Sequence, residues 1–154
     1  MNGDTPGACA FCDIVAGTRP ATIVAHDALT IAFLDQRQFH PGHVLVVPRR
    51  HVSDIRGADD QMAAAILVMV ARVARAVDAT FPGDGLSIWH SAGAGANQEV
   101  PHLHFHIHPR RIGDGLLDVY PTPPTLPPRA TLEAWGARLV TALAEIAASQ
   151  PDER

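Results

Sequence analysis

The chain has 154 residues, of which 47% are hydrophobic and 18% charged, and its formal net charge is −4. This length suits one ordinary domain that can bury a core, and the weak acidity argues against a dedicated DNA- or RNA-binding surface. No apolar run approaches the roughly 20 residues of a membrane-spanning helix, and the N-terminus lacks the features of a signal peptide, so we expect a cytoplasmic protein without a membrane partner.

Three short strands are predicted in the first third of the chain. Residues 22–26 (TIVAH) and 29–35 (LTIAFLD) are rich in β-branched and apolar residues and lie two residues apart, which is typical of a β-hairpin. Pro41 and Gly42 indicate a turn before a third strand at 43–48 (HVLVVP).

The middle of the chain is predicted to form a helix and two more strands. The helix should run from Ala58 to Thr80, because apolar residues recur there at helical spacing. These residues are Met62, Ile66, Met69, Val70, Val73 and Val77. A strand at 86–91 (LSIWHS) then leads through the small-residue loop 92–98 to a histidine-rich strand.

The last part of the chain contains a proline-rich segment at 121–128 (PTPPTLPP), which permits neither a helix nor a central strand and predicts an extended linker. A final helix should follow at about 131–148. Hairpin-length links among the strands favour an α+β fold, with an antiparallel sheet of about five strands and two main helices, over a doubly wound sheet.

Residues 102–108 (HLHFHIH) hold four of the nine histidines, at every second position. In a strand Leu103, Phe105 and Ile107 would face the core, and all four histidines would share the opposite face. Neighbours on that face are about 7 Å apart, so one phosphate can contact two of them. Three explanations are open: the solvated side of an edge strand, a metal site on the strand, and nucleophilic attack by imidazole on phosphorus.

This pattern resembles the triad His-apolar-His-apolar-His-apolar of the histidine-triad (HIT) family of nucleotide hydrolases and transferases. Three other segments resemble bacterial members: CAFCDIVAGTRPA their N-terminal segment, IAFLDQRQFHPGHVLVVPRRHV their central hairpin, and GAGANQEVPH the loop before the triad. The resemblance covers about residues 9–111. It implies that 1–154 is a single HIT-like domain and that two subunits pair through the central helix and sheet edge as a homodimer.

The resemblance also implies roles for the triad histidines. His104, the middle member, would attack the α-phosphorus of a purine nucleotide and form a nucleotidyl-histidine intermediate that water then releases. His106 would contact a phosphate oxygen or the leaving group. Histidine at this position points to a hydrolase rather than to the related uridylyltransferases, which have glutamine there. The implied substrates are nucleoside phosphoramidates, adenylylated amines and dinucleoside polyphosphates.

Two rival functions stay open. The protein is alternatively a nucleotide-binding module with little turnover, or a nucleotidyltransferase. A polynucleotide-processing role is disfavoured because no basic extension follows residue 111.

Five further residues are candidates for nucleotide binding by resemblance. Asp35 is expected to accept hydrogen bonds from the ribose hydroxyls, although an aspartate at a strand end also commonly caps a turn. Ile14 and Phe33 resemble the positions that hold the base, and ordinary core positions would look the same. Gln98 and Ser91 belong to the loop expected to contact phosphate.

Cys9 and Cys12 form a CxxC pair. Alone, the pair is compatible with a metal site, a redox pair or two unpaired thiols. Many bacterial triad proteins bind a structural zinc ion with such a pair, a histidine after the central hairpin and the first triad histidine, which here are His51 and His102. A Cys2His2 set closes a tetrahedral shell, so this zinc would be structural rather than hydrolytic.

His108 departs from the family, which usually has an apolar residue at this position. It would either add a phosphate contact at the rim or be a solvated residue. We favour the solvated residue, because Pro109 is expected to end regular strand pairing. His43 aligns with a frequent family histidine near the site, and His26 is expected to be exposed.

Overall fold

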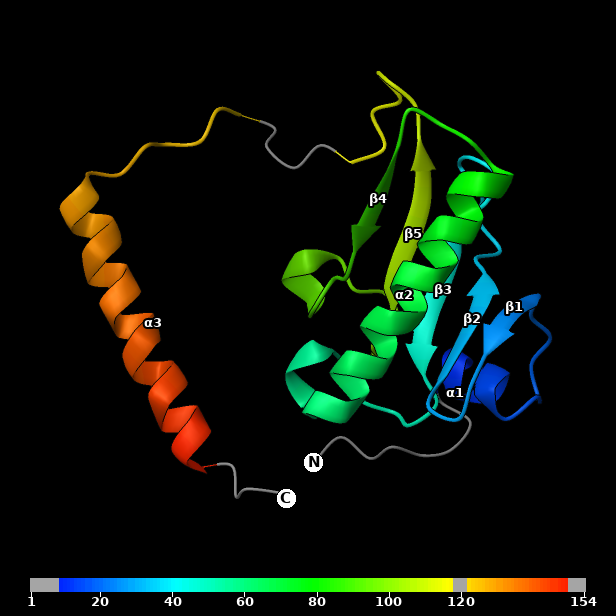
Figure 1. Ribbon diagram of the computed structural model, residues 1–154, viewed down its shortest axis with the longest axis horizontal. Helices are drawn as coiled ribbons and strands as arrows, with labels where there is room; N and C mark the ends of the chain where they lie inside the picture. Colours follow the sequence, from blue (N-terminus) through cyan, green and yellow to red (C-terminus); the bar gives the residue numbers. More distant parts are fainter. Residues whose placement is uncertain (1–8, 118–121, 150–154) are drawn as a thin grey trace. The chain divides into compact units, whose positions relative to one another are not determined.

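The structure is a computed structural model that describes residues 9–117 and 122–149. The chain divides into two compact units, and the boundary along the sequence lies between Leu116 and Leu117. The first unit contains an antiparallel five-stranded sheet with the strand order β1-β2-β3-β5-β4 (Figure 1). Its strands are Ile23–His26 (β1), Thr30–Leu34 (β2), Val44–Pro48 (β3), Gly85–Trp89 (β4) and Phe105–Arg110 (β5). Its helices are Ala10–Val15 (α1) and Asp60–Thr80 (α2), with short 3-10 helices at Ile55–Gly57 (η1) and Ala94–Ala96 (η2). The predicted α+β class is therefore confirmed.

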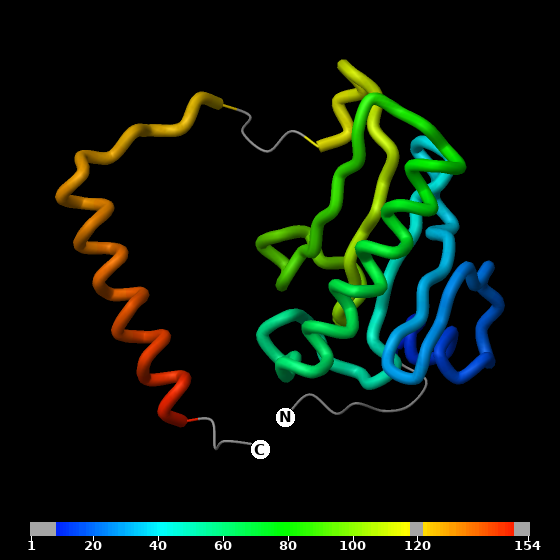
Figure 2. The backbone as a smooth tube through the Cα atoms, in the orientation of Figure 1, coloured from blue at the N-terminus to red at the C-terminus, as the bar shows by residue number. Residues whose placement is uncertain are grey.

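Helix α2 covers one face of the sheet, as the backbone trace in Figure 2 shows. All six apolar positions predicted for its inner face are buried, and they pack against Ala32, Val44, Val46, Leu103 and Ile107. The helix begins after Asp59, whose carboxylate accepts a hydrogen bond of 2.8 Å from the backbone N–H of Met62 and so caps the first turn.

Helix α1 covers the other face of the sheet and was not predicted as a helix. Its six residues are too few for a helical repeat to be recognised in the sequence. Phe11 from this helix packs against a second apolar cluster, formed by Ile31, Phe33, Leu45 and Val47. The two faces of the sheet thus have separate cores, and the second one adjoins the histidines.

Strand β5 corrects the prediction for His108. The strand begins at Phe105 rather than at His102, and it continues through Pro109, which pairs with Leu86 of β4. Beyond Ile107, no pairing with β3 is formed. The carbonyl oxygen of Arg110 accepts a hydrogen bond from the Asp84 N–H, on the β4 side of the strand. Neighbouring residues of a strand direct their backbone groups to opposite sides, so the Pro109 nitrogen points to the β3 side. Among the described residues no strand is paired there, so the missing N–H of proline costs no hydrogen bond of the sheet. His108 is accordingly only 1% exposed, so the prediction of a solvated residue was wrong.

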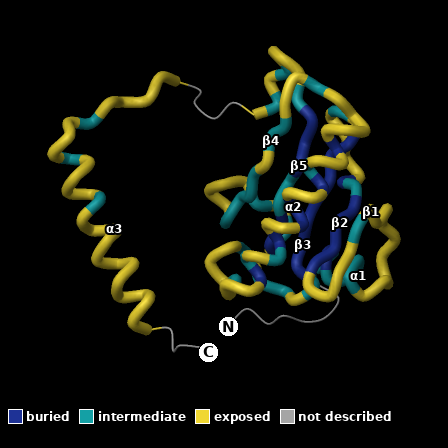
Figure 3. The backbone as a smooth tube through the Cα atoms, in the orientation of Figure 1, coloured by how far each residue is buried: buried dark blue, intermediate teal, exposed yellow. Residues whose placement is uncertain are grey.

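The second unit contains helix α3, Arg129–Ser149, which confirms the predicted final helix. Residues 122–128 contain neither helix nor strand, as expected for a linker, whereas residue 121 lies outside the described residues. No described residue of α3 is buried (Figure 3). Throughout the described ranges, no helix is long and apolar enough to cross a membrane.

Candidate active site

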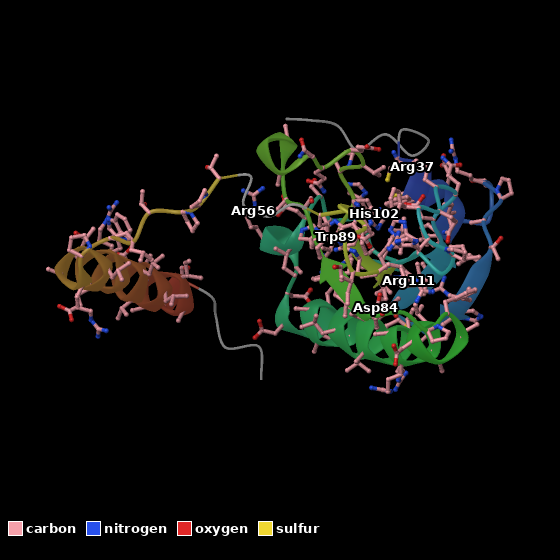
Figure 4. All side chains as sticks on the ribbon, turned by 90° about the horizontal axis from the view of Figure 1, so that it is seen from above. Arg37, Arg56, Asp84, Trp89, His102 and Arg111 are labelled. Atoms are coloured by element: carbon pink, nitrogen blue, oxygen red, sulfur yellow. The ribbon has the colours of Figure 1, made fainter. Side chains whose placement is uncertain are left out.

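The triad histidines lie on the sheet face opposite α2, as the alternation of the strand predicts. His106 is directly opposite Leu45, a member of the cluster that packs on α1. The ring centroids of His104 and His106 are 4.9 Å apart. Figure 4 shows Arg37 and His102 on the side of this unit away from α2.

His104 is held with one nitrogen bonded and the other free to react. Its Nδ1 lies 2.6 Å from the carbonyl oxygen of His102, and since a carbonyl only accepts, Nδ1 carries the hydrogen. The lone pair is therefore on Nε2. Burial lowers the pKa of His104, which keeps the ring neutral. A neutral imidazole with an available Nε2 lone pair has the chemistry of a nucleophile.

Two aromatic side chains that were not predicted as site residues flank His104. The Phe11 ring lies 5.2 Å from it on one side and the His90 ring 6.2 Å away on the other. His90 Nδ1 donates to the His104 carbonyl oxygen at 2.9 Å, and its Nε2 accepts from the Ile55 N–H at 3.3 Å. Sequence analysis missed Phe11 because it lies on the unpredicted helix α1.

His106 is oriented through His43. His43 Nδ1 is 3.2 Å from the carbonyl oxygen of Arg37, so this nitrogen carries the hydrogen and His43 Nε2 is an acceptor. His106 Nδ1 donates to that acceptor at 2.9 Å, which leaves the lone pair of His106 on Nε2. Burial, reinforced by neighbouring imidazoles and by the Arg37 guanidinium, lowers the pKa of His106 to about 3. The ring is therefore neutral, with its lone pair at Nε2.

Trp89 stacks on His106 and also lies beside His43, with ring centroids 5.8 Å apart. The rings of Trp89 and His106 are parallel within 3°, with centroids 4.3 Å apart. Trp89 and His106 are also cross-strand partners of β4 and β5. From the sequence, Trp89 was predicted only as a strand residue. Its contact with His106 depends on the register between two strands, which neither strand determines alone.

A cleft of about 1070 Å³ is lined by Phe11, whose ring lies 5.2 Å from that of His104. Three of the predicted nucleotide-binding residues also line it: Ile14, Phe33 and Asp35. Ile14 and Phe33 give it apolar surface. Asp35 is 7% exposed, and its Oδ1 accepts from the Arg37 N–H at 2.8 Å, as in a turn-capping aspartate. Arg37 also forms a bidentate ion pair with Glu99 at the cleft, with bonds of 2.8 and 3.2 Å, which the sequence did not reveal.

The other two candidates belong to the loop after β4 rather than to the cleft. Gln98 closes this loop: its Oε1 accepts from the Gly93 N–H at 2.7 Å, and its Nε2 donates to the Ser53 carbonyl at 2.6 Å. Ser91 is half-buried and follows His90 directly. Both predicted phosphate contacts stay predictions.

The four predicted metal ligands come together at the N-terminal side of the triad. One ligand atom of each of Cys9, Cys12, His51 and His102 lies within 4.8 Å of the others. The His102 Nδ1 is 3.5 Å from each cysteine sulfur and 3.3 Å from His51 Nδ1. Ligands on a tetrahedral zinc ion are separated by roughly 3.3–3.8 Å, given its bond lengths.

The orientation of His102 also fits a metal. Its Nε2 donates to the carbonyl oxygen of Pro48 at 2.9 Å, which directs the Nδ1 lone pair at the thiols. Burial lowers the pKa of His102 to about 4, so the ring is neutral, as a ligand must be. The donor set and its geometry therefore suit a tetrahedral ion.

A five-stranded α+β body, with paired imidazoles on the sheet face that also forms this cleft, is the architecture of the histidine-triad class. The HIT domain family model matches residues 16–113, and the chain belongs to this family. Adenosine 5′-monophosphoramidase of Schizosaccharomyces pombe is 36% identical over 102 residues, which are 66% of this chain and 74% of that protein.

Two solved structures extend the comparison. A HIT family protein from Bacillus anthracis superposes with a TM-score of 0.83 and 29% identity, covering 90% of this chain and 99% of that one. A zinc-bound histidine triad family protein from Mycobacterium smegmatis superposes with a TM-score of 0.67 and 33% identity, covering 95% of this chain and 100% of that one.

Proposed function

We propose that the protein is a nucleotide hydrolase that cleaves purine nucleoside phosphoramidates, or dinucleoside polyphosphates, at the α-phosphorus. The observation that carries the proposal is His104, a neutral imidazole with its Nε2 lone pair available. Its ring lies 5.2 Å from that of Phe11, which lines a cleft with both apolar and charged side chains. The S. pombe relative, which is an adenosine 5′-monophosphoramidase by name, supports the same reaction.

The first step is displacement of the leaving group by His104. Nε2 attacks the α-phosphorus, the bond from phosphorus to the leaving nitrogen or oxygen breaks, and a nucleotidyl–His104 intermediate forms. A leaving amine requires a proton, which a His106 protonated at Nε2 would donate. The hydrogen bond from His104 Nδ1 to a carbonyl stabilises the positive charge that develops on the ring.

The second step is attack by water on the same phosphorus. The bond from phosphorus to His104 Nε2 breaks, the nucleoside monophosphate is released, and the proton of the water passes to His106 Nε2. Because burial holds the pKa of His106 at about 3, this proton then passes to solvent, so each turnover takes up one proton for the leaving amine and releases one from the water. The acceptor orientation of His106, imposed by His43, supports this role.

In the proposed complex, the nucleoside occupies the cleft. Ile14 and Phe33 would contact the base, and Asp35 would accept from the ribose hydroxyls. We also propose a homodimer, because α2 exposes Leu67 and Val68 (54% and 50%) and the edge strand β4 exposes Ile88 (46%). Light scattering coupled to size exclusion would measure the mass in solution.

A structural zinc ion is proposed at Cys9, Cys12, His51 and His102, on the basis of their ligand spacing. When bound, zinc would supply a fourfold covalent cross-link rather than a reactive water, since four protein ligands fill its tetrahedral shell. These ligands join α1, the segment after β3 and the residues that precede His104. The zinc-bound M. smegmatis relative supports this assignment.

The decisive experiment is incubation with a fluorogenic adenosine phosphoramidate. Wild-type protein is expected to release amine and AMP, and His104→Ala is expected to release neither above background. The matched control is His26→Ala, which removes an exposed histidine on β1 and should retain activity. Equal, slow release by wild type and His104→Ala would instead favour the binding module. Transfer of the adenylyl group to an added alcohol or sugar phosphate would favour a transferase.

A further inference from the structure

A second group of polar side chains lies behind His43, outside the proposed reaction centre. The His108 ring is 4.7 Å from the ring of His43 and 5.7 Å from that of His40. His40 is in turn 3.1 Å from Asp114 through its Nε2. We call His40, His108 and Asp114 the support layer.

Asp114 anchors this layer firmly. Its carboxylate accepts from the guanidinium of Arg110, from the Arg111 N–H at 2.9 Å and from the Leu116 N–H at 3.0 Å. The bonds from Arg110 hold the pKa of Asp114 far below its usual range, so the carboxylate is ionised. His40 is therefore attached to a fixed anion, and it limits the movement of His108 from one side.

The orientation of His108 is fixed, but its burial is unfavourable. Its Nδ1 donates to the carbonyl oxygen of Pro109 at 2.6 Å, so the lone pair is on Nε2. Nε2 is buried and has no hydrogen-bond partner among the described residues. Burying such a nitrogen costs stability, whereas an apolar side chain of similar size would not have this cost. A buried group that lowers stability in this way often has a functional role.

We propose that His108 is a positioning residue that, supported by His40 and Asp114, keeps His43 in the orientation that presents His106 as a proton acceptor. His43 donates to the Arg37 carbonyl and accepts from His106, so any rotation of its ring breaks both bonds. The His108 ring packs against the His43 ring, with centroids 4.7 Å apart, and so opposes movement of His43 towards it. This proposal rests on the proposed hydrolase function in one respect: an effect of His108 on kcat requires that His106 takes part in turnover.

This role and a purely structural role predict opposite results for His108→Ile. Isoleucine is β-branched and similar in size to histidine, so it suits a buried position on a strand. A structural role predicts a lower Tm with unchanged kcat. A positioning role predicts a Tm at or above wild type, because the unpaired nitrogen is removed, together with a lower kcat.

The test combines kinetics, stability and histidine NMR. With adenosine phosphoramidate, His108→Ile is expected to lower kcat about tenfold or more, because misplaced catalytic groups lose rate steeply. KM and AMP affinity should stay within about twofold, since the cleft is untouched. Ile107→Val, on the same strand but facing α2, is the control and should keep its kcat. A folded His108→Ile with wild-type kcat, or one that loses Tm and kcat in parallel with Ile107→Val, overturns the proposal.

The NMR arm separates this proposal from the proposed function. Two-bond ¹H–¹⁵N correlation spectra of wild-type protein labelled at histidine should show His43, His106 and His108 all protonated at Nδ1. In His108→Ile, His43 and His106 should show mixed tautomers. Any other wild-type pattern overturns the positioning role, even if turnover is normal. Absence of turnover with the expected tautomers would refute only the hydrolase proposal.

Discussion

Replacing His106 by glutamine should separate the two proposed steps. The neutral His106 uses Nδ1–H to bond His43 at 2.9 Å, and its other nitrogen carries the reactive lone pair. A glutamine amide N–H can replace the first interaction, but the amide cannot accept a proton. His106→Gln should therefore keep the position of the side chain and lose only its acid–base function, which is worth about 10²–10⁴-fold in rate.

The assay uses an adenylyl ester of an acidic phenol, whose leaving group requires no proton. With such a substrate the first step should remain fast in His106→Gln, while attack by water on the nucleotidyl–His104 intermediate becomes slow. Rapid-quench experiments should show a burst of about one phenol per active chain, followed by turnover reduced about 10²–10⁴-fold. Mass spectrometry should detect the adenylyl adduct on His104, and His104→Ala should show neither burst nor adduct.

Two outcomes would refute this reasoning. Steady turnover of the phenol ester within about threefold of wild type would mean that His106 is not the base for water. Loss of the burst while AMP still binds would mean that His106 is needed to form the intermediate, even for a leaving group that needs no proton. In the second case His106 would act chiefly by stabilising charge on the phosphate oxygens.

Three further predictions follow from the same geometry. The wild-type chain should bind one metal ion, and Cys12→Ser should lose this ion together with several degrees of Tm. Metal analysis by mass spectrometry and a chelator titration would measure the loss. A wild-type protein that chelators do not affect would favour a redox pair. Burial lowers the pKa of His106 from 6.5 to about 3, so below pH 6.5 the unfolded chain binds the additional proton. The unfolding free energy should thus fall by about 1 kcal/mol per pH unit between about pH 6 and pH 4 on account of this residue, and urea titrations of wild type and His106→Gln should differ by that slope. Asp35→Asn should raise KM for adenosine phosphoramidate about tenfold with little change in kcat, and the increase should vanish with a substrate that lacks the ribose hydroxyls.

The elements predicted best are those whose periodicity is long or whose boundaries have strong local signals. Helix α2 repeats its apolar residues from Met62 to Val77, over about four turns at 3.6 residues per turn, and all six predicted inner positions are buried. Strands β1 to β4 begin and end within two residues of the prediction. Helix α1 is one and a half turns long and has no such repeat, and the limits of β5 depend on which neighbouring strand continues beside it.

Within the site, alternation correctly placed the histidines on one face, and the family resemblance led to residues that the fold then brought together. What the sequence did not reveal depends on contacts between distant segments. Trp89 reaches His106 only through the register of β4 with β5. His40 reaches Asp114 across 74 positions of the chain. The error at His108 has the same origin, because Pro109 is compatible with a strand that has a partner on one side only.

The four alternating histidines differ in chemistry because of which ring nitrogen is bonded to an acceptor and because of what surrounds the other nitrogen. His102 donates from Nε2 to a backbone carbonyl, which directs its Nδ1 lone pair at the two thiols. His104 donates from Nδ1, which leaves Nε2 available to attack phosphorus. His106 donates from Nδ1 to another imidazole, so the accepted proton and its charge can be shared with a second ring. His108 also donates from Nδ1, but its Nε2 is enclosed by side chains and cannot reach a substrate. The proposed roles of metal ligand, nucleophile, proton acceptor and support thus rest on two features of each ring: which nitrogen bonds a fixed acceptor, and what surrounds the other nitrogen.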